Sequence, residues 1–272
     1  MRNVGRKLAF VLASSNHGTM IVNRLDYRMT DPEHGYGVGH RILEAAAYEP
    51  TEVELALHLL EARRRFHGDG VVGIDCGANI GVHAIEWATA MTGWGSVIAI
   101  EAQERIYYAL AGNIAINNCF NAIAMNAAVS SDNGVMRVPN PDYLTASSFG
   151  SLELRGGERT EFIGQAVDYS EGSLVPVQMI TLDALNLPRV DLIKIDVEGM
   201  ELEVLDGAEQ TLARSRPVLL VESVKAGRDA LRGKMTGHGY TVVDAGPNLL
   251  AIHNSDETLT QLQVDQLRSS AA

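Results

Sequence analysis

Two carboxylates close together in the chain are the side chains best suited to acid–base chemistry. Asp196 and Glu198 stand at the end of a predicted strand, with one residue between them. Alternate residues of an extended chain share a face, so the two carboxylates converge if the extended geometry persists. Such a pair can take the proton of an alcohol nucleophile or orient a substrate. The alternative is structural, because carboxylates are also favourable where a helix begins, as it does after Gly199.

A turn of small residues indicates a second kind of site. Asp75 ends an apolar run, and Gly77, Ala78 and Asn79 follow it before an amphipathic stretch. A turn without bulky side chains lets a ligand approach the backbone, and a helix N-terminus adds unpaired N–H groups and partial positive charge. Glu101 ends the next apolar run, roughly 20 residues past the turn, where an acid suits the two hydroxyls of a ribose. Together these features predict a site for a nucleoside cofactor.

The elements that would position these residues alternate along the chain. We expect strands at 71–75, 96–100, 122–129, 190–196 and 217–222, and helices at 79–91, 103–117, 200–213 and 225–237. Such alternation predicts a parallel sheet with right-handed crossovers, and ligands bind at the carboxyl ends of its strands. The runs at 240–243 and 249–252 indicate an antiparallel hairpin at the sheet edge. Because the carboxyl ends of parallel strands lie at one edge of the sheet, the polar residues that end the strands, including Glu222, are expected at that edge.

The rest of the chain is predicted to frame that α/β domain. Residues 1–50 form an N-terminal extension with a β-hairpin and a short helical piece, residues 51–254 the main domain, and residues 255–272 a polar tail. Residues 130–173 interrupt the alternation as a long irregular insertion. Long irregular loops in compact domains are often functional, so we expect this insertion to form part of a substrate wall, plain surface decoration being the alternative.

Composition excludes several classes of partner. The formal net charge of −12 disfavours binding to a phosphate backbone, so we expect no nucleic-acid partner. No apolar run approaches the length of about 20 residues that spans a membrane, and the apolar part of residues 2–13 is too short for a signal peptide. We therefore expect a cytoplasmic protein without a membrane partner. Cys76 and Cys119 are predicted to be buried free thiols. No histidine spacing indicates a metal site, although clustered carboxylates could hold a divalent cation weakly.

The motifs resemble those of the FkbM family. They are Gly73-Ile74-Asp75-Cys76-Gly77-Ala78-Asn79-Ile80-Gly81, then Ile100-Glu101, Asn126-Ala127-Ala128-Val129-Ser130, Thr181-Leu182-Asp183 and Ile193-Lys194-Ile195-Asp196-Val197-Glu198-Gly199. The resemblance covers about residues 48 to 252, and its one departure is Ala102-Gln103, where a proline is common. The resemblance implies a methyltransferase dependent on S-adenosylmethionine. It also implies a Rossmann-like, seven-stranded class I methyltransferase sheet, mostly parallel, with a C-terminal antiparallel hairpin.

The resemblance also implies roles for the cofactor-side residues. Gly77, Ala78 and Asn79 would contact the methionine part of S-adenosylmethionine, which has a carboxylate but no phosphate. Glu101 would bind the ribose hydroxyls, and Asn126 and Ala127 would contact the edge of the adenine. Asp75 would hold the turn or reach the ammonium group through water. Each has a plainer alternative, since glycines serve turns, Glu101 could be a solvated acid and Asn126 could cap a turn.

For the reaction we expect displacement at the methyl group. Asp196 would be a cofactor-facing acid and possible base, and Glu198 would orient the substrate or act as the base. Lys194 shares the face of Asp196 and could pair with it. The leading hypothesis is O-methylation of a hydroxyl on a small molecule or sugar-containing metabolite. Alternatives are a carboxylate O-methyltransferase, a nicotinamide-dependent reductase and a non-catalytic nucleoside-binding protein. The sequence favours no particular oligomeric state.

Overall fold

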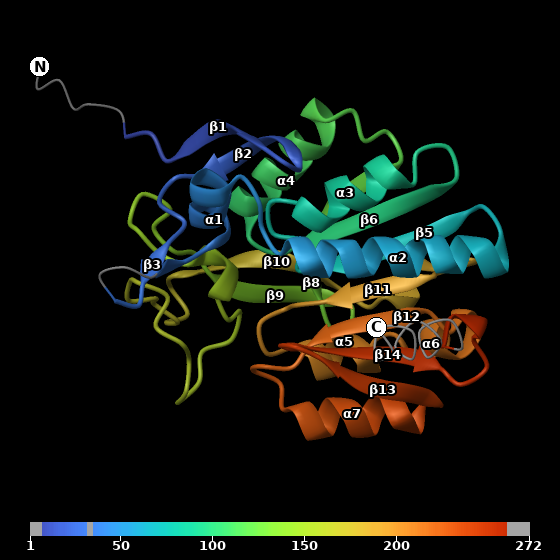
Figure 1. Cartoon of the computed structure of the whole chain (residues 1–272). Helices are drawn as coiled ribbons and strands as arrows, with labels where there is room; N and C mark the ends of the chain where they lie inside the picture. The colour runs from blue at the N-terminus through green and yellow to red at the C-terminus, as the bar shows by residue number, and fades with distance from the viewer. Residues whose placement is uncertain (1–6, 32–34, 260–272) are drawn as a thin grey trace, which may run out of the picture.

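A seven-stranded sheet forms the centre of the protein (Figure 1). The computed structural model describes residues 7–31 and 35–259. The strand order is β13-β14-β12-β11-β5-β6-β7, with bounds β5 Val71–Cys76, β6 Gly95–Glu101, β7 Ala122–Asn126, β11 Leu192–Ile195, β12 Val218–Glu222, β13 Tyr240–Ala245 and β14 Asn248–His253. Strands β12, β11, β5, β6 and β7 are parallel, and β14 is antiparallel to both of its neighbours. This confirms the predicted mostly parallel sheet and its C-terminal hairpin.

Helices cover both faces of this sheet. Helices α2 (Pro50–His67), α3 (Val82–Ala90) and α4 (Glu104–Ile116) bury their apolar residues with one face, around the fully buried Trp87. Helices α5 (Glu201–Asp206), α6 (Glu209–Ser215) and α7 (Arg228–Gly237) do so on the other face. The central strands are apolar on both sides because neither face meets water, which is typical of parallel sheets. This sandwich leaves the strand ends as the place for polar groups.

The N-terminal extension packs against the main domain. Strands β1 (Phe10–Ser15) and β2 (Gly18–Asn23) form the predicted hairpin, which lies beside α4 (Figure 1). The side chain of Asn113 on α4 accepts the N–H of Ile21 at 2.5 Å and donates to its carbonyl at 3.2 Å. The extension continues through β3 (Arg28–Met29), β4 (Gly35–Tyr36) and α1 (Val38–Ala45). Its buried side chains belong to the same core as α2 and α3.

The predicted strand 122–129 and insertion 130–173 are arranged differently in the structure. After β7 the chain passes Ala127 and enters a second, three-stranded sheet, made of β8 (Ala128–Val129), β10 (Leu174–Ile180) and β9 (Gly134–Pro139). Strand β9 lies inside the segment that was expected to be irregular. Met136 and Val138 are buried while Val135 and Arg137 are exposed, which is the alternation of a strand. The sequence hides this alternation, because the exposed Val135 is as apolar as its buried neighbours.

Two predicted helices also have different bounds. The expected helix 200–213 is two helices, α5 and α6, because Asp183 accepts the N–H groups of Gln210 and Thr211 and so caps a new helix start. Gly207 lies at the break, where a Cβ would be 2.1 Å from the carbonyl oxygen of Ser130. The expected helix 79–91 begins only at Val82, since Asn79 adopts the left-handed conformation with φ +49°.

Three further predictions concern the C-terminal tail, the two cysteines and membrane-spanning segments. Of the predicted polar tail 255–272, residues 260–272 lie outside the described part, and Asp256 is buried and bonded to Arg63 of α2. Cys76 and Cys119 are buried free thiols, as predicted. Within residues 7–31 and 35–259, no helix is both long and apolar enough to cross a membrane.

Candidate active site

A cavity of about 580 Å³ lies at the carboxyl ends of β5, β6, β11 and β12, where the sheet topology predicts a ligand site. That volume is in the usual range for small-molecule sites. The residues that the sequence singled out and that line this cavity are Asp75, Gly77, Ala78, Asn79, Glu101, Ala127, Asp196 and Glu198. Asn126 is not among the lining residues. One cavity therefore brings together both the nucleoside-type and the acid–base groups.

Glu101 is a buried carboxylate that its own chain holds in place. Oε2 accepts the N–H of Asn79 at 3.0 Å, and Oε1 accepts the N–H of Gln103 at 2.7 Å. Burial raises the pKa of Glu101 to about 7, although both N–H bonds act in the opposite direction. A carboxylate has about four acceptor positions, so two remain for a ligand. The geometry can thus receive a pair of hydroxyl donors without any rearrangement of the side chain.

The turn after β5 is tied to β6 through its N–H groups. Gly77 and Ala78 both donate to the carbonyl oxygen of Ile100 at 2.9 Å, and Asn79 donates to Glu101. The N–H groups of these three residues are therefore not the unpaired donors that the sequence predicted for a ligand at this turn. Parallel pairing of β5 and β6 aligns Cys76 with Ile100, which places that carbonyl within reach. Contacts of these three residues with the methionine part of a cofactor would use other atoms.

Gly77 is required by the neighbouring strand. Its φ is +80°, and a Cβ at this position would lie 1.7 Å from the carbonyl oxygen of Asp196. The end of β11 therefore fills the space that a side chain would need. The sequence left two reasons open for this glycine, the turn and the approach of a ligand, and the observed contact supports the structural one.

Asp75 has the opposite environment to Glu101. Its side chain is 1% exposed, and both carboxylate oxygens lack a hydrogen-bond partner in the described part of the chain. Burial raises the pKa of Asp75, and the nearby Lys194 acts against this rise. The carboxylate does not hold the turn. A buried polar group without a partner calls for one, so Asp75 is suited to a donor or cation on a bound ligand.

Asn126 and Ala127 differ in their relation to the cavity. The side-chain amide of Asn126 donates to the carbonyls of Glu101 at 2.8 Å and Ala102 at 3.1 Å. It fastens the loop that follows β6, which matches the alternative role of a turn-holding residue. Ala127 does line the cavity. Contact of either residue with an adenine stays a prediction.

Asp196 is held by the predicted partner. Lys194 Nζ donates to Asp196 Oδ2 at 2.9 Å, which confirms the expected pair. Burial lowers the pKa of Lys194, but four carboxylates, Asp196 foremost, outweigh it and hold the pKa well above its ordinary value. Lys194 thus remains a buried cation, with 5% of its side chain exposed, while the Asp196 side chain is 30% exposed. Asp196 is oriented by the lysine and accessible from the cavity.

Glu198 reaches the cavity by a turn. Strand β11 ends at Ile195, and Glu198 has a φ of +57°, so the expectation that extended geometry persists to this residue is wrong. Lys225 Nζ lies 2.5 Å from Glu198 Oε2 and also 3.2 Å from Glu161 of the insertion. Burial and the charge of Asp196 raise the pKa of Glu198, and Lys225 opposes them. Both carboxylates still line one cavity, so they converge through the turn.

Several lining residues come from segments away from the strand ends. Tyr48 and Glu49, just before α2, lie in a segment that the sequence did not assign to the site, whereas Ser148 and Ser151 belong to the insertion that was expected to form part of the substrate wall. The side chain of Gln103 donates to the carbonyl of Phe149 and so binds the insertion to the start of α4. The departure from the family pattern at Ala102-Gln103 was the available signal. For Tyr48 and Glu49 the only signal was their position before Pro50, a helix start.

With this geometry established, the family can be assigned. The family model described as "Methyltransferase FkbM domain" matches residues 75–242, more than half of the chain. The protein belongs to the FkbM methyltransferase family. The methyltransferases of this family use S-adenosylmethionine, and the sheet has the expected seven-stranded, mostly parallel arrangement with an antiparallel C-terminal hairpin. Membership of this family argues against the alternative hypothesis of a nicotinamide-dependent reductase. No curated protein matches the chain in sequence.

Three solved structures illustrate the similarity in fold. The FkbM methyltransferase of Methylobacillus flagellatus KT has 16% identity over 68% of this chain, with a TM-score of 0.46, and the match covers 43% of that protein. Precorrin-6y C5,15-methyltransferase of Geobacter metallireducens GS-15 has 15% identity over 77% of this chain and 90% of its own, with a TM-score of 0.42. TYW2 of M. jannaschii, solved in complex with AdoMet, has 12% identity over 92% and 86%, with a TM-score of 0.40. The chain thus spans less than half of the first of these proteins.

Proposed function

We propose that this FkbM methyltransferase transfers the methyl group of S-adenosylmethionine to a hydroxyl oxygen of a small molecule or sugar-containing metabolite. The observation that carries the proposal is the single cavity lined by Glu101, Asp75, Asp196 and Glu198. Glu101 has free acceptor positions for the hydroxyl groups of a ribose. Asp75 has two carboxylate oxygens that could accept hydrogen bonds from an ammonium group. With the cofactor bound in this way, we expect the carboxylates that follow β11 to lie beside its methyl group, on the side of the acceptor.

The reaction needs positioning and the removal of one proton. The acceptor oxygen attacks the methyl carbon in line with the sulfur, a carbon–oxygen bond forms, and the carbon–sulfur bond breaks to leave a neutral thioether. The hydroxyl proton passes to a carboxylate. Glu198 suits this role because a raised pKa makes its ionised form a better proton acceptor near neutral pH. Lys194 fixes Asp196 for contact with the acceptor.

The acceptor side of the cavity favours a hydroxyl over the alternative carboxylate acceptor. Asp196, Glu198 and Glu222 all line it, and burial raises the pKa of Glu222 as it does that of Glu198. A wall with three carboxylates disfavours an anionic acceptor, since each of them that is ionised would repel it. Residues 130–173 contribute Ser148 and Ser151 to the lining, which supports the proposal that the insertion is part of the substrate wall.

The test replaces the proton acceptor and measures methyl transfer. Glu198→Gln keeps the shape of the side chain and an oxygen for Lys225 but cannot accept the proton. We expect turnover to fall by roughly 10²–10⁴-fold with a panel of labelled hydroxyl acceptors, while binding of S-adenosylhomocysteine stays within a few-fold. Glu158→Gln, which removes an exposed carboxylate of the insertion, is the matched control. Unchanged turnover in Glu198→Gln would remove this residue from catalysis, and a cofactor that binds without any methyl transfer would favour the non-catalytic alternative.

A further inference from the structure

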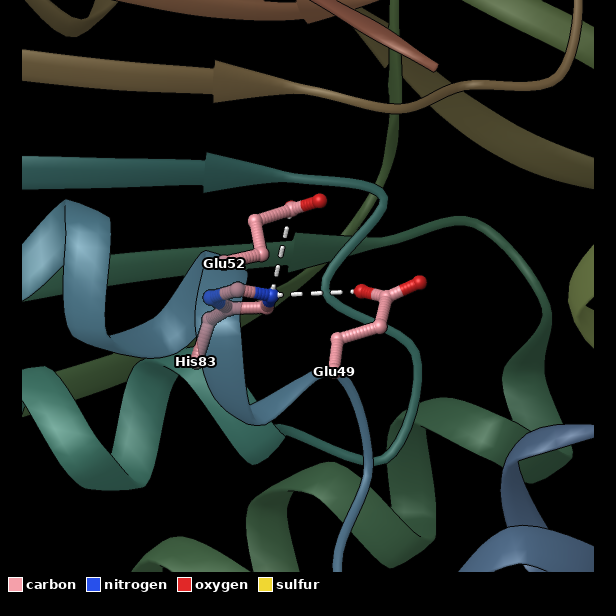
Figure 2. Close-up of side chains that lie close together, drawn as sticks. All are labelled: Glu49, Glu52 and His83. Carbon is pink, nitrogen blue, oxygen red and sulfur yellow. Dashed lines mark hydrogen bonds and ion pairs between the residues drawn. The ribbon is translucent and has the colours of Figure 1, made fainter. Parts of the chain in front are cut away.

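Three side chains with metal-ligand chemistry meet in the wall of the cavity. Glu49 and Glu52 stand at the start of α2, and His83 lies on the first turn of α3 (Figure 2). His83 Nε2 is 3.5 Å from Glu49 Oε2 and 3.4 Å from Glu52 Oε1. In the described part of the chain, these are the residues whose ligand atoms all lie within 4.8 Å of one another. Glu49 and His83 also line the cavity, which gives an ion a path of entry.

The separations fit ligands of a common ion better than hydrogen bonds. Nitrogen–oxygen hydrogen bonds in proteins cluster between about 2.7 and 3.2 Å, so contacts of 3.4 and 3.5 Å are at or beyond the useful limit. Two ligands that each lie about 2.0–2.1 Å from a tetrahedral zinc ion are about 3.4 Å apart. The two separations from Nε2 therefore match those of ligands that share such an ion, and all three ligand atoms lie within 4.8 Å of one another.

Buried groups around the cluster lack partners. Glu52 Oε1 is buried without a hydrogen bond, and Asp75, which is 1% exposed and lines the same cavity, has two such oxygens. The nearby charges of Lys194, His83, Asp196 and Glu49 all act on Asp75. Lys194 is 3.9 Å from Glu52 but bonds Asp196 at 2.9 Å. Four carboxylates act on this one lysine, and a metal ion held by the cluster would add positive charge among them.

We propose that Glu49, Glu52 and His83 bind one divalent transition-metal cation of the zinc class. An imidazole nitrogen with two carboxylate oxygens suits zinc, whereas magnesium prefers oxygen ligands alone. Asn248 bonds the other oxygen of Glu52 at 2.5 Å and so fixes the carboxylate that would ligate the ion. This site does not depend on which acceptor the enzyme methylates.

The ammonium group of the cofactor is the competing occupant of the same negative region. Zinc titration of the chelator-treated protein without cofactor distinguishes the two, with metal content measured after dialysis. We expect one zinc per chain, and a loss of affinity of at least tenfold in Glu52→Gln and His83→Gln. His58→Gln, which removes an exposed histidine of α2, should bind zinc as the unchanged protein does. Wild-type protein that binds no zinc, or His83→Gln that binds it unchanged, would overturn the proposal. Weaker S-adenosylhomocysteine binding in the variants without zinc binding in the wild type would assign the cluster to the ammonium group.

A second measurement on unchanged protein covers the case in which the variants fail to fold. X-ray absorption at the zinc edge of the loaded wild type should show one imidazole among oxygen ligands. Sulfur ligands or several imidazoles would place the ion elsewhere and reject this site.

Discussion

Glu101 and Asp75 end adjacent strands of the same sheet and line the same cavity, yet their surroundings are opposite. Glu101 accepts two backbone N–H groups, from Asn79 and Gln103. Neither oxygen of Asp75 accepts a hydrogen bond from residues 7–31 or 35–259. The chain itself holds the Glu101 carboxylate in place before a cofactor binds. The Asp75 carboxylate would gain its hydrogen-bond donors only from a bound ligand. In this site, therefore, one acid serves both the fold and binding, while the other serves binding alone.

The largest effect is expected from Glu101→Ala, because this change removes both functions at once. Two buried N–H groups lose their acceptor, at a cost of about 1–3 kcal/mol each, part of which is offset because a buried carboxylate is also removed. We expect a net loss of roughly 2 kcal/mol in the free energy of unfolding and at least a hundredfold weaker binding of S-adenosylhomocysteine. Denaturant unfolding and calorimetry measure the two. A variant that loses stability but binds normally would show that Glu101 is structural alone.

Asp75→Asn should separate binding from stability. The change removes a buried charge that accepts no hydrogen bond from the described residues, so the free energy of unfolding should not fall. Binding should weaken by roughly 10–100-fold, since a hydrogen bond to a charged group contributes about 1.5–3 kcal/mol. The same two measurements apply. A clear loss of stability would mean that Asp75 has a partner within the fold, and the contrast with Glu101 would fail.

A smaller effect, of about tenfold, is expected from pH. The raised pKa of Glu101, about 7 against an ordinary 4.5, means that folding favours the protonated carboxyl. Its contribution to stability is full below pH 4.5 and is lost as the pH rises to about 7. Binding should have the opposite trend, because ribose hydroxyls donate to the ionised form. Affinity for S-adenosylhomocysteine should rise about tenfold from pH 6 to 8. Glu101→Gln should flatten this rise, and an equal rise in that variant would assign it to another group.

The position of the site could be predicted from the sequence because each key acid ends an apolar run. Asp75, Glu101 and Asp196 follow buried stretches, and parallel strands bring such ends to one rim. The pairing of Lys194 with Asp196 also followed from strand alternation. Both predictions depend only on neighbouring residues in the sequence, and the strands of the structure have the expected positions.

What could not be predicted depends on contacts between distant parts of the chain. The N–H groups of Gly77 and Ala78 bond Ile100 because of the register between β5 and β6, which local pattern does not specify. The break between α5 and α6 depends on Asp183, more than 20 residues earlier in the chain. Glu49 joins His83, 34 residues away, only because α2 and α3 pack together.

The most direct test of the account is a crystal structure of the protein with S-adenosylhomocysteine. We expect both ribose hydroxyls within about 3 Å of the Glu101 carboxylate oxygens, the ammonium group beside Asp75 and the sulfur facing Asp196. A nucleoside bound outside this cavity, or a ribose that does not contact Glu101, would contradict it.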